Sequence, residues 1–228
     1  MILYELDGRD GRRFSPYCWR TDMALHHKGL TAERVPVAFA DKSPLDFTDY
    51  KKVPVLVDNG RTIIESFDIA VYLDETYPDR PPLMAGPEAR GLARFVNEWA
   101  DRVINPAIVT LIVADILDDT TDADREHFRS TREARFGCRL EEVCGDPEAR
   151  LATLDKALSP ARATLGKQAY LSGHHPGYAD YILFGSLQWA RCTSATSLLK
   201  EEDPLYAWRG RLLDMFEGYA GKAPGHPV

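Results

Sequence analysis

The sequence predicts an α/β region followed by a region that is helical throughout. Short β-branched runs alternate with helical patterns over residues 1–79, whereas helical periodicity alone continues over residues 88–228. Closely spaced prolines lie between the two regions and mark a stiff connection (Pro78, Pro81 and Pro82). We therefore predict two domains, 1–79 and 88–228, joined by a linker over residues 80–87.

The composition excludes several classes of protein. With 44% hydrophobic and 28% charged residues, the chain is an ordinary globular protein, and its net charge of -7 argues against nucleic-acid binding. No basic segment precedes an apolar core near Met1, and the longest apolar run, residues 107–114, is too short to cross a bilayer. Four cysteines without zinc-ligand spacing indicate a reducing compartment, so we expect a cytoplasmic protein.

The first helix is expected to begin at Ser15 and Pro16, after an apolar strand over residues 2–6. Ser suits the N-cap because its hydroxyl can accept from a free amide, and Pro suits the first helical position. A helix start also favours a bound anion, so a thiolate would be stabilised near Ser15 and Cys18. Taken alone, this stretch favours a structural interpretation, with Ser15 only a cap and Cys18 a small core residue.

The rest of the first domain predicts one more strand, a hairpin and a helix. Apolar alternation over residues 33–39 indicates a strand, and Pro36 restricts it to a sheet edge. A polar connection or short helix follows. Asn59-Gly60 between two β-branched runs predicts a hairpin, and Ser66 is expected to cap the next helix. The predicted order is therefore β-α-β-α-β-β-α.

The second domain carries helical patterns with few local signals of function. Pro106 is expected to bend or break the first of its helices. Residues 122–144 are so heavily charged that we interpret them as a solvated surface helix, and residues 204–219 as the last helix. One apolar stripe runs along the first helix of this domain at helical spacing (Leu92, Phe95, Val96, Trp99 and Val103).

Three motifs follow one another in the first domain. They are Ser15-Pro16-Tyr17-Cys18-Trp19-Arg20, Val53-Pro54 and Glu65-Ser66-Phe67-Asp68-Ile69. Together, within this frame of strands and helices, they resemble the thioredoxin-like domain of the glutathione transferases. The run over residues 15–29 and the later run over residues 72–81 are similar to the β-etherase branch, the lignin-ether-cleaving bacterial transferases and their fungal relatives. Residues 171–182 are similar to the helix-capping motif of the family's all-helical second domain, with Gly177 in place of the usual Ser or Thr.

The resemblance implies that Ser15 is the catalytic residue. Its hydroxyl would donate to the glutathione sulfur and favour the thiolate, which is the nucleophilic form. Tyr17, Cys18 and Trp19 are secondary candidates at the same place. We expect Cys18 to be a packing residue in preference to a redox-sensitive neighbour, because the reductases of this fold place a cysteine where this chain has Ser15.

Glutathione itself, the implied co-substrate, would be held by the other two motifs. The resemblance implies that Glu65 pairs with the ammonium group of glutathione and that Ser66 holds the adjacent carboxylate. It also implies a cis peptide bond at Val53-Pro54, which would turn the backbone of Val53 toward the cysteinyl residue. Lys51 and Lys52 are candidates for the glycyl carboxylate, with at least one of them expected to be solvated.

These features predict an enzyme that directs the glutathione thiolate at a hydrophobic electrophile, by conjugation or substitution, with aryl-ether cleavage among the reactions. Three alternatives stay open: a glutathione-dependent isomerase of the zeta kind, a thiol-disulfide reductase, and a ligand-binding protein without turnover. The resemblance further implies a homodimer through helices over residues 66–77 and 88–101. No metal is expected, because the adjacent histidine pairs lack completing ligands at a suitable spacing.

Overall fold

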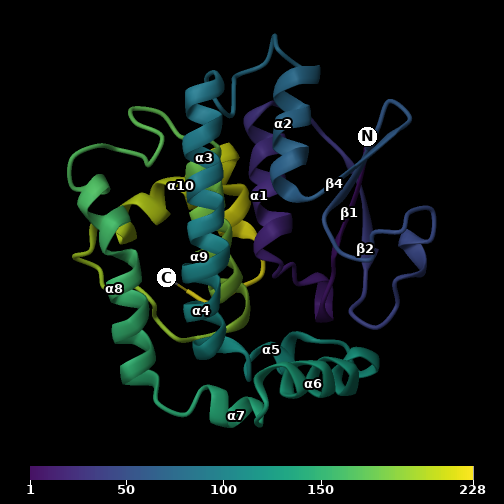
Figure 1. Ribbon diagram of the computed structural model, residues 1–228, viewed down its shortest axis with the longest axis vertical. Coiled ribbons are helices and arrows are strands. Elements are labelled where there is room, and N and C mark those ends of the chain that lie inside the picture. The colour runs from purple at the N-terminus through teal and green to yellow at the C-terminus, as the bar shows by residue number, and fades with distance from the viewer. Residues whose placement is uncertain (228) are drawn as a thin grey trace.

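A four-stranded sheet forms the centre of the first domain in the computed structural model, which describes residues 1–227 (Figure 1). The strand order is β2-β1-β3-β4, and β1 and β2 are parallel while β3 and β4 are antiparallel to their neighbours. Pro36 therefore lies in the edge strand β2, as predicted. The strands are β1 (Ile2–Leu6), β2 (Glu33–Val37), β3 (Val55–Asp58) and β4 (Arg61–Ile64).

The predicted hairpin is confirmed by the turn between β3 and β4. Asn59 and Gly60 both have positive φ, 49° and 73°. A two-residue turn of this type matches the twist of the flanking strands only when both residues adopt the left-handed conformation, which asparagine and glycine tolerate best. The Asn-Gly pair thus sets the register between the two strands.

Two helices pack on the sheet, α1 (Pro16–His27) and α2 (Ser66–Thr76), on the side that faces the second domain (Figure 1). The helix allowed for between β2 and β3 is only a 3₁₀ turn, Ser43–Leu45, and another 3₁₀ turn, Arg9–Gly11, follows β1. The thioredoxin-like arrangement is confirmed, with this one element reduced to a single turn.

The second domain is helical throughout, as predicted. In Figure 1, α3 leads into α4 as one long rod, and Pro106 lies at the start of α4 directly after a π-helical turn. Pro106 therefore changes the type of helix at the preceding turn rather than ending the rod. Within residues 1–227 no helix is long and apolar enough to cross a membrane. The elements are α3 (Pro87–Trp99), the π turn (Ala100–Ile104), α4 (Asn105–Ile112), α5 (Ile116–Asp119), α6 (Asp122–Phe136), α7 (Leu140–Val143), α8 (Pro147–Leu165), α9 (Tyr178–Thr193) and α10 (Pro204–Lys222).

One prediction for this domain is wrong. The charged stretch 122–144 is not one solvated helix: it forms α6 and α7, and Phe128 and Leu140 are buried. The predicted last helix is present as α10, and its backbone leaves the helical conformation between 215 and 218. The chain turns there so that Tyr219 packs its ring against His26 of α1, with ring centroids 3.8 Å apart.

The helix α1 packs along α9 of the second domain as well as on the sheet of its own domain. Gly185 of α9 lies so close to the start of α1 that a Cβ atom there would overlap the carbonyl oxygen of Pro16. Arg20 of α1 is fully buried, and it pairs with Asp101 at 2.7 Å and donates to Asn97 at 3.0 Å. The element that carries Ser15 is therefore positioned from both domains.

The start of α9 confirms the predicted capping motif. The carboxylate of Asp180 accepts from the amide of Gly177 at 3.1 Å, the half of the capping box that does not need a serine or threonine. The same carboxylate accepts from the amide of Leu171 at 2.7 Å and from the indole of Trp208 at 2.8 Å. Asp180 thus ties the preceding loop and α10 to the helix that supports α1.

Candidate active site

Ser15 caps α1 and borders a cavity between the two domains. Its Oγ accepts from the amide of Cys18 at 3.2 Å, and Pro16 follows at the first helical position, so the predicted cap is confirmed. Because the oxygen is used as an acceptor, its hydroxyl hydrogen stays available to donate. The cavity, which we call the Ser15 cavity, has a volume of about 630 Å³.

The Ser15 cavity brings together six of the candidate residues singled out from the sequence. They are Ser15, Tyr17, Lys51, Lys52, Val53 and Glu65. The cavity is therefore lined by the start of α1, the segment before β3 and the turn before α2, which are far apart in the sequence. The remaining candidates, which are Cys18, Trp19, Pro54 and Ser66, are buried and do not line it.

The Val53-Pro54 peptide bond is cis, as the resemblance implied. Pro54 is buried, whereas Val53 is partly exposed and lines the cavity. This segment lies directly before β3, next to Lys52. Val53 thus forms part of the cavity wall.

Glu65 has an unusual backbone conformation at the edge of the cavity. Its φ and ψ are 64° and 128°, a region that costs a residue with a Cβ atom free energy and that clusters at functional sites. Its carboxylate accepts from the hydroxyl of Tyr50 at 2.7 Å. Burial and this hydrogen bond raise the pKa of Tyr50, so the hydroxyl stays protonated and fixes the carboxylate.

The prediction that Ser66 caps α2 is wrong. The helix begins one residue earlier than predicted, because the last non-helical residue is Glu65; Glu65 is therefore the N-cap residue and Ser66 is the first residue of the helix. The carbonyl of Ser66 accepts from the buried hydroxyl of Tyr178 at 2.6 Å, a contact from the second domain. The amide and hydroxyl of Ser66 remain at the positive end of α2, where an anion is favoured.

The two adjacent lysines before β3 differ in their surroundings. Lys51 pairs with Asp46 at 2.9 Å and donates to the carbonyl of Leu45. Within residues 1–227 Lys52 has no ion-pair partner, and its ammonium group lies 6.0 Å from the ring centroid of Tyr50. Of the two candidates for the glycyl carboxylate, Lys52 is therefore the one whose charge is available.

Cys18 and Trp19 lie in the core behind the cavity. The side chain of Cys18 is buried, and burial raises the pKa of its thiol to about 12, so it is not a thiolate near neutral pH. The indole of Trp19 donates to the carbonyl of Arg13 at 2.8 Å. Tyr17 differs from both, because it lines the cavity with the guanidinium of Arg20 at 4.7 Å from its ring centroid.

The second domain contributes residues that sequence reasoning missed. Phe128, Arg132 and Arg135 of α6 line the Ser15 cavity. Their spacing of four and three residues was a usable signal, because it places them on one face of the helix. The high charge of residues 122–144 favours a solvated helix, so this face is not recognised as part of a site from the sequence alone. Lys42, in the loop after β2, was missed as well and lines the same cavity.

No metal centre accompanies the cavity in the part of the chain that the structure describes: no three His, Cys, Asp or Glu side chains gather at a distance suited to one ion. The groups present instead are hydroxyls, lysine and arginine cations, one exposed carboxylate and aromatic rings. Such a set suits an organic ligand with both charged and apolar parts.

The fold and the cavity define a two-domain protein in which a thioredoxin-like domain and a helical domain line one binding site. Models of the glutathione S-transferase N-terminal and C-terminal domains match residues 14–76 and 91–219. The chain therefore belongs to the glutathione S-transferase family, and it is a transferase.

Relatives of known structure and sequence agree with this assignment. Glutathione transferase GST 23 of Zea mays is 31% identical over 209 residues, 87% of this chain and 81% of the relative. Glutathione transferase GSTFuA3 from Phanerochaete chrysosporium superposes with a TM-score of 0.75 at 26% identity, covering 97% of this chain and 93% of that chain. The glutathione S-transferase CsGST63524 of Ceriporiopsis subvermispora, solved in complex with glutathione, has a TM-score of 0.79 at 23% identity and covers 95% and 96%.

Proposed function

We propose that this transferase activates glutathione at Ser15 and joins it to the electrophilic carbon of an aromatic small molecule bound in the Ser15 cavity. The observation that carries the proposal is the position of Ser15. Its hydroxyl is oriented by the amide of Cys18, lies at the positive end of α1 and borders the cavity. Both the hydroxyl donor and the helix dipole lower the free energy of a bound thiolate.

Glutathione would lie along the first domain, residues 1–79. Glu65 would pair with its ammonium group, and Ser66 at the start of α2 would bind the neighbouring carboxylate. The backbone of Val53 would contact the cysteinyl residue, and Lys52 would bind the glycyl carboxylate. The glutathione complex of the Ceriporiopsis relative supports this ligand.

The acceptor substrate would be held by the second domain, residues 88–228, which follows the connection over residues 80–87. Val109 of α4, Val113 just after α4 and Ile116 of α5 line the cavity. Phe14 lies beside Ser15 in the sequence and its ring packs on Phe39, with centroids 5.8 Å apart. Apolar walls next to the thiolate exclude water and suit an aromatic acceptor.

Each reaction would be a displacement by the thiolate. A carbon–sulfur bond forms at the electrophilic carbon, and the leaving group departs with the electron pair of the bond that breaks. When the leaving group is a phenolate, the reaction is the ether cleavage of the β-etherase branch, which we retain among the proposed substitutions. Ser15 keeps its proton throughout and stabilises the charge on sulfur before the attack.

A reductase centred on Cys18 is disfavoured by two observations. Cys18 is buried outside the cavity, and its thiol pKa of about 12 leaves almost no thiolate to attack a disulfide. The isomerase and the ligand-binding protein use the same glutathione contacts, so activity assays distinguish them.

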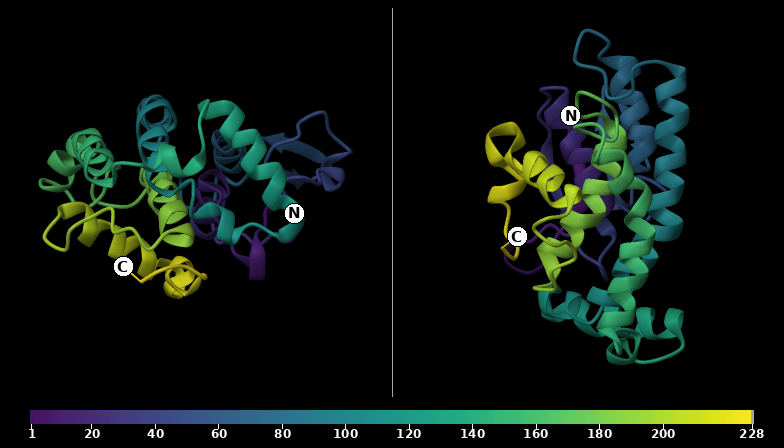
Figure 2. Two further views of the ribbon diagram at one scale, coloured as in Figure 1. Left: turned by 90° about the horizontal axis from the view of Figure 1, so that it is seen from below. Right: turned by 90° about the vertical axis from the view of Figure 1, so that its left-hand side faces the viewer.

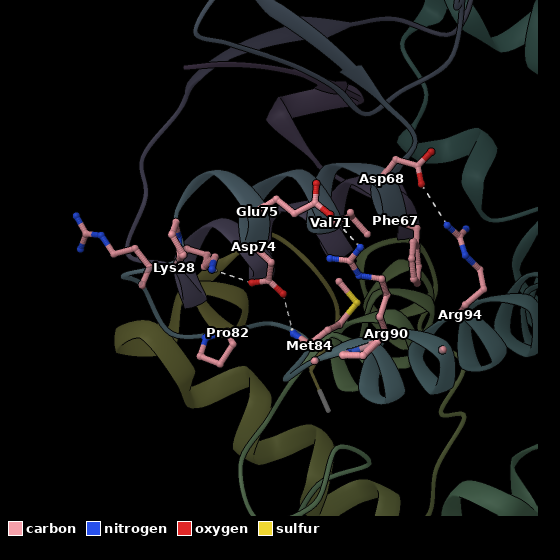
Figure 3. Close-up of a pocket in the computed structure, with 15 residues that line it drawn as sticks. Lys28, Phe67, Asp68, Val71, Asp74, Glu75, Pro82, Met84, Arg90 and Arg94 are labelled. Carbon is pink, nitrogen blue, oxygen red and sulfur yellow. Dashed lines mark hydrogen bonds and ion pairs between the residues drawn. The ribbon is translucent and has the colours of Figure 1, made fainter.

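We also propose a homodimer that forms over α2 and α3. A cleft of about 780 Å³ lies between these helices, and Figure 3 shows side chains from both along it. Part of the apolar stripe predicted on α3 faces outward, with Leu92 69% and Phe95 71% exposed, while Val96 and Trp99 pack against the core. Such a patch is uncommon on the surface of a monomer, and a second copy of the chain would cover it.

A reducing compartment, the cytoplasm, is proposed for this enzyme because its substrate is a thiol. Cys18, Cys138, Cys144 and Cys192 are all free, as such a compartment favours.

The proposal is tested by assaying the purified chain with glutathione and a panel of activated aryl halides, β-aryl ethers and disulfides. We expect turnover of the aryl halides or the ethers and none of the disulfides. Retention on immobilised glutathione without turnover of any acceptor would instead identify a ligand-binding protein. Turnover of the disulfides alone would show that the Ser15 mechanism is wrong.

A further inference from the structure

One face of α6 carries cations into the Ser15 cavity. Phe128, Arg132, Arg135 and Phe136 follow one another at spacings of four, three and one, which places them along one stripe of the helix. All four line the cavity. The view from below in Figure 2 shows α6 crossing from the helical domain toward the sheet.

The arginines of α6 fall into two groups. On the outer faces, Arg125 pairs with Asp118, and Arg129 pairs with Glu133 at 2.8 Å and with Glu141 at 2.8 Å. The two arginines that line the cavity, Arg132 and Arg135, have no ion-pair partner in residues 1–227. Arg132 donates only to the neighbouring hydroxyl of Thr131, at 3.2 Å.

Arg132 is partly buried although its charge is not compensated by a carboxylate. Its guanidinium lies 4.8 Å from the ring centroid of Phe128 and 5.7 Å from that of Phe39. Burial, followed by the like charge of Arg135, lowers its pKa. A half-buried cation held beside another cation is costly unless an anion joins it.

Aromatic rings surround this cation. Phe39 and Phe128 pack edge to face with centroids 5.1 Å apart, and Phe39 also contacts Phe14, the neighbour of Ser15. Lys42 adds a further charge at 5.8 Å from the centroid of the same Phe39 ring. The cavity thus offers an aromatic wall that extends from beside Ser15 to a cationic site.

The cations are held in place by an anchor at the other end of α6. The carboxylate of Asp124 is almost fully buried, and it accepts from the amides of Phe39 and Ala40 at 3.1 and 2.6 Å. The helix is therefore tied to the loop after β2. This tie restrains α6 and so places Arg132 over Phe39 before any ligand binds, which lowers the cost of binding an anion.

We propose that the acceptor substrate is an aromatic electrophile with an anionic group, a carboxylate or a sulfonate, which Arg132 and Arg135 bind. The inference rests on the proposed function, since it names the class of substrate for that site. The glycyl carboxylate of glutathione is a different anion, which we assign to Lys52. Guanidinium groups suit a carboxylate because two parallel N–H donors match its two oxygens.

A matched pair of acceptors tests the proposal, 4-chloro-3,5-dinitrobenzoate and its neutral carboxamide. In both, the glutathione thiolate attacks the carbon that bears chlorine, a carbon–sulfur bond forms, and chloride leaves with the electron pair. Because the two rings differ in intrinsic reactivity, each kcat/KM is divided by the uncatalysed rate constant with glutathione. We expect the corrected value to be higher for the benzoate.

Arg132→Gln should lower kcat/KM for the benzoate by about tenfold to a hundredfold, as loss of a hydrogen bond to a charged group does. The carboxamide should change less than about threefold, and the KM for glutathione should not change. Arg132→Lys should restore part of the benzoate activity, because a point charge replaces the planar group. Arg139→Gln removes the same charge from a side chain 71% exposed and outside the cavity, and should leave both acceptors unaffected.

Three results would overturn the proposal. An equal fall for both acceptors would mean that Arg132 only packs on the aromatic rings. A higher KM for glutathione in Arg132→Gln would assign the cation to the glycyl carboxylate. A corrected preference for the carboxamide in the wild type would contradict the charge argument directly.

A binding measurement separates this inference from the proposed function. Calorimetry with 3,5-dinitrobenzoate and 3,5-dinitrobenzamide, in the presence of S-methylglutathione, needs no reaction. Tighter binding of the benzoate that is lost in Arg132→Gln would support the anion site even if no acceptor were turned over. Equal binding of the two compounds would contradict the anion site even if the transferase activity were present.

Discussion

The two hollows of this molecule differ in how their charges are paired. In the cleft between α2 and α3, Arg90 pairs with Glu75 at 2.9 Å and Arg94 with Asp68 at 3.2 Å (Figure 3). Lys28 is paired as well, with Asp74 at 2.7 Å, and Arg80 is the one cation lining this cleft without an ion pair in residues 1–227. The cleft is also the larger of the two, about 780 Å³ against about 630 Å³ for the Ser15 cavity. In the Ser15 cavity, Arg132 has no such partner in the described part of the chain.

This difference indicates what each hollow binds. Cations already neutralised by neighbouring carboxylates gain little from a small anion, whereas unpaired cations gain most. Beside the cleft, α3 carries the exposed apolar side chains of Leu92 and Phe95, which suit a protein surface. Charge pairing therefore assigns the small molecule to the Ser15 cavity, although its volume is the smaller.

The largest effect is expected for Ser15. Ser15→Ala should lower kcat by about tenfold to a thousandfold while the Kd for glutathione changes little, because the hydroxyl acts on the charge of the bound sulfur. The pKa of bound glutathione, followed through the ultraviolet absorbance of its thiolate, should rise. Cys18→Ala is the matched control in the same turn and should keep its activity; the reverse pattern would refute the proposed mechanism.

The second test concerns the proposed dimer interface over α2 and α3. Phe95→Glu should raise the dissociation constant of the proposed dimer by about thirtyfold or more, because a buried charge replaces an exposed aromatic ring at the interface. Sedimentation velocity at micromolar concentration measures it, and Ala152→Glu on the exposed face of α8 serves as a control. A wild-type chain that sediments as a monomer would remove the dimer from the proposal.

A smaller effect separates the two adjacent lysines. Lys52→Gln should raise the KM for glutathione by about fivefold to tenfold, as loss of an unpaired cation that binds the glycyl carboxylate would. Lys51→Gln should change it less than about twofold, because Lys51 is already paired with Asp46 at 2.9 Å. Equal effects of the two substitutions would show that pairing does not decide which lysine binds.

The smallest effect concerns paired charges in the core. Burial, then the nearby Asp22, raises the pKa of Glu5 to about 7 against the opposing effect of Arg34. The folded state therefore retains a proton that the unfolded chain loses above its ordinary pKa, so the stability from this group is present at low pH and declines as pH rises through about 7. Measured by urea unfolding, the free energy of unfolding of the wild type should fall by on the order of 1 kcal/mol more than that of Glu5→Gln between about pH 5 and pH 7. Identical pH slopes would contradict the shift.

Local signals were enough to predict the first domain and part of the site. The Asn-Gly turn, the proline in the edge strand and the Ser15 cap each depend on neighbouring residues only, and the structure has all three. The family motifs supplied the cis bond at Val53-Pro54, which no local preference would have indicated.

What could not be predicted depends on contacts between distant segments. Phe128 is buried because the chain folds α6 onto Phe39, nearly ninety residues earlier, and the charge of the segment concealed this. Leu92 and Phe95 follow a core-like spacing yet face outward. A helical stripe indicates only that one face is apolar, and it does not indicate what covers that face.

Gly185 makes the two domains of this enzyme depend on each other, although each has its own arrangement of helices and strands. A methyl group at this position would overlap the carbonyl oxygen of Pro16, so α1 and α9 would have to separate and Ser15 would move away from the residues of the second domain that line its cavity. Any recombination that joins this first domain to a different helical domain therefore has to bring a glycine, or an equally close approach, at the same place. The need for glycine at residue 185 therefore limits which helical domains, and with them which acceptor specificities, such chains can exchange during evolution.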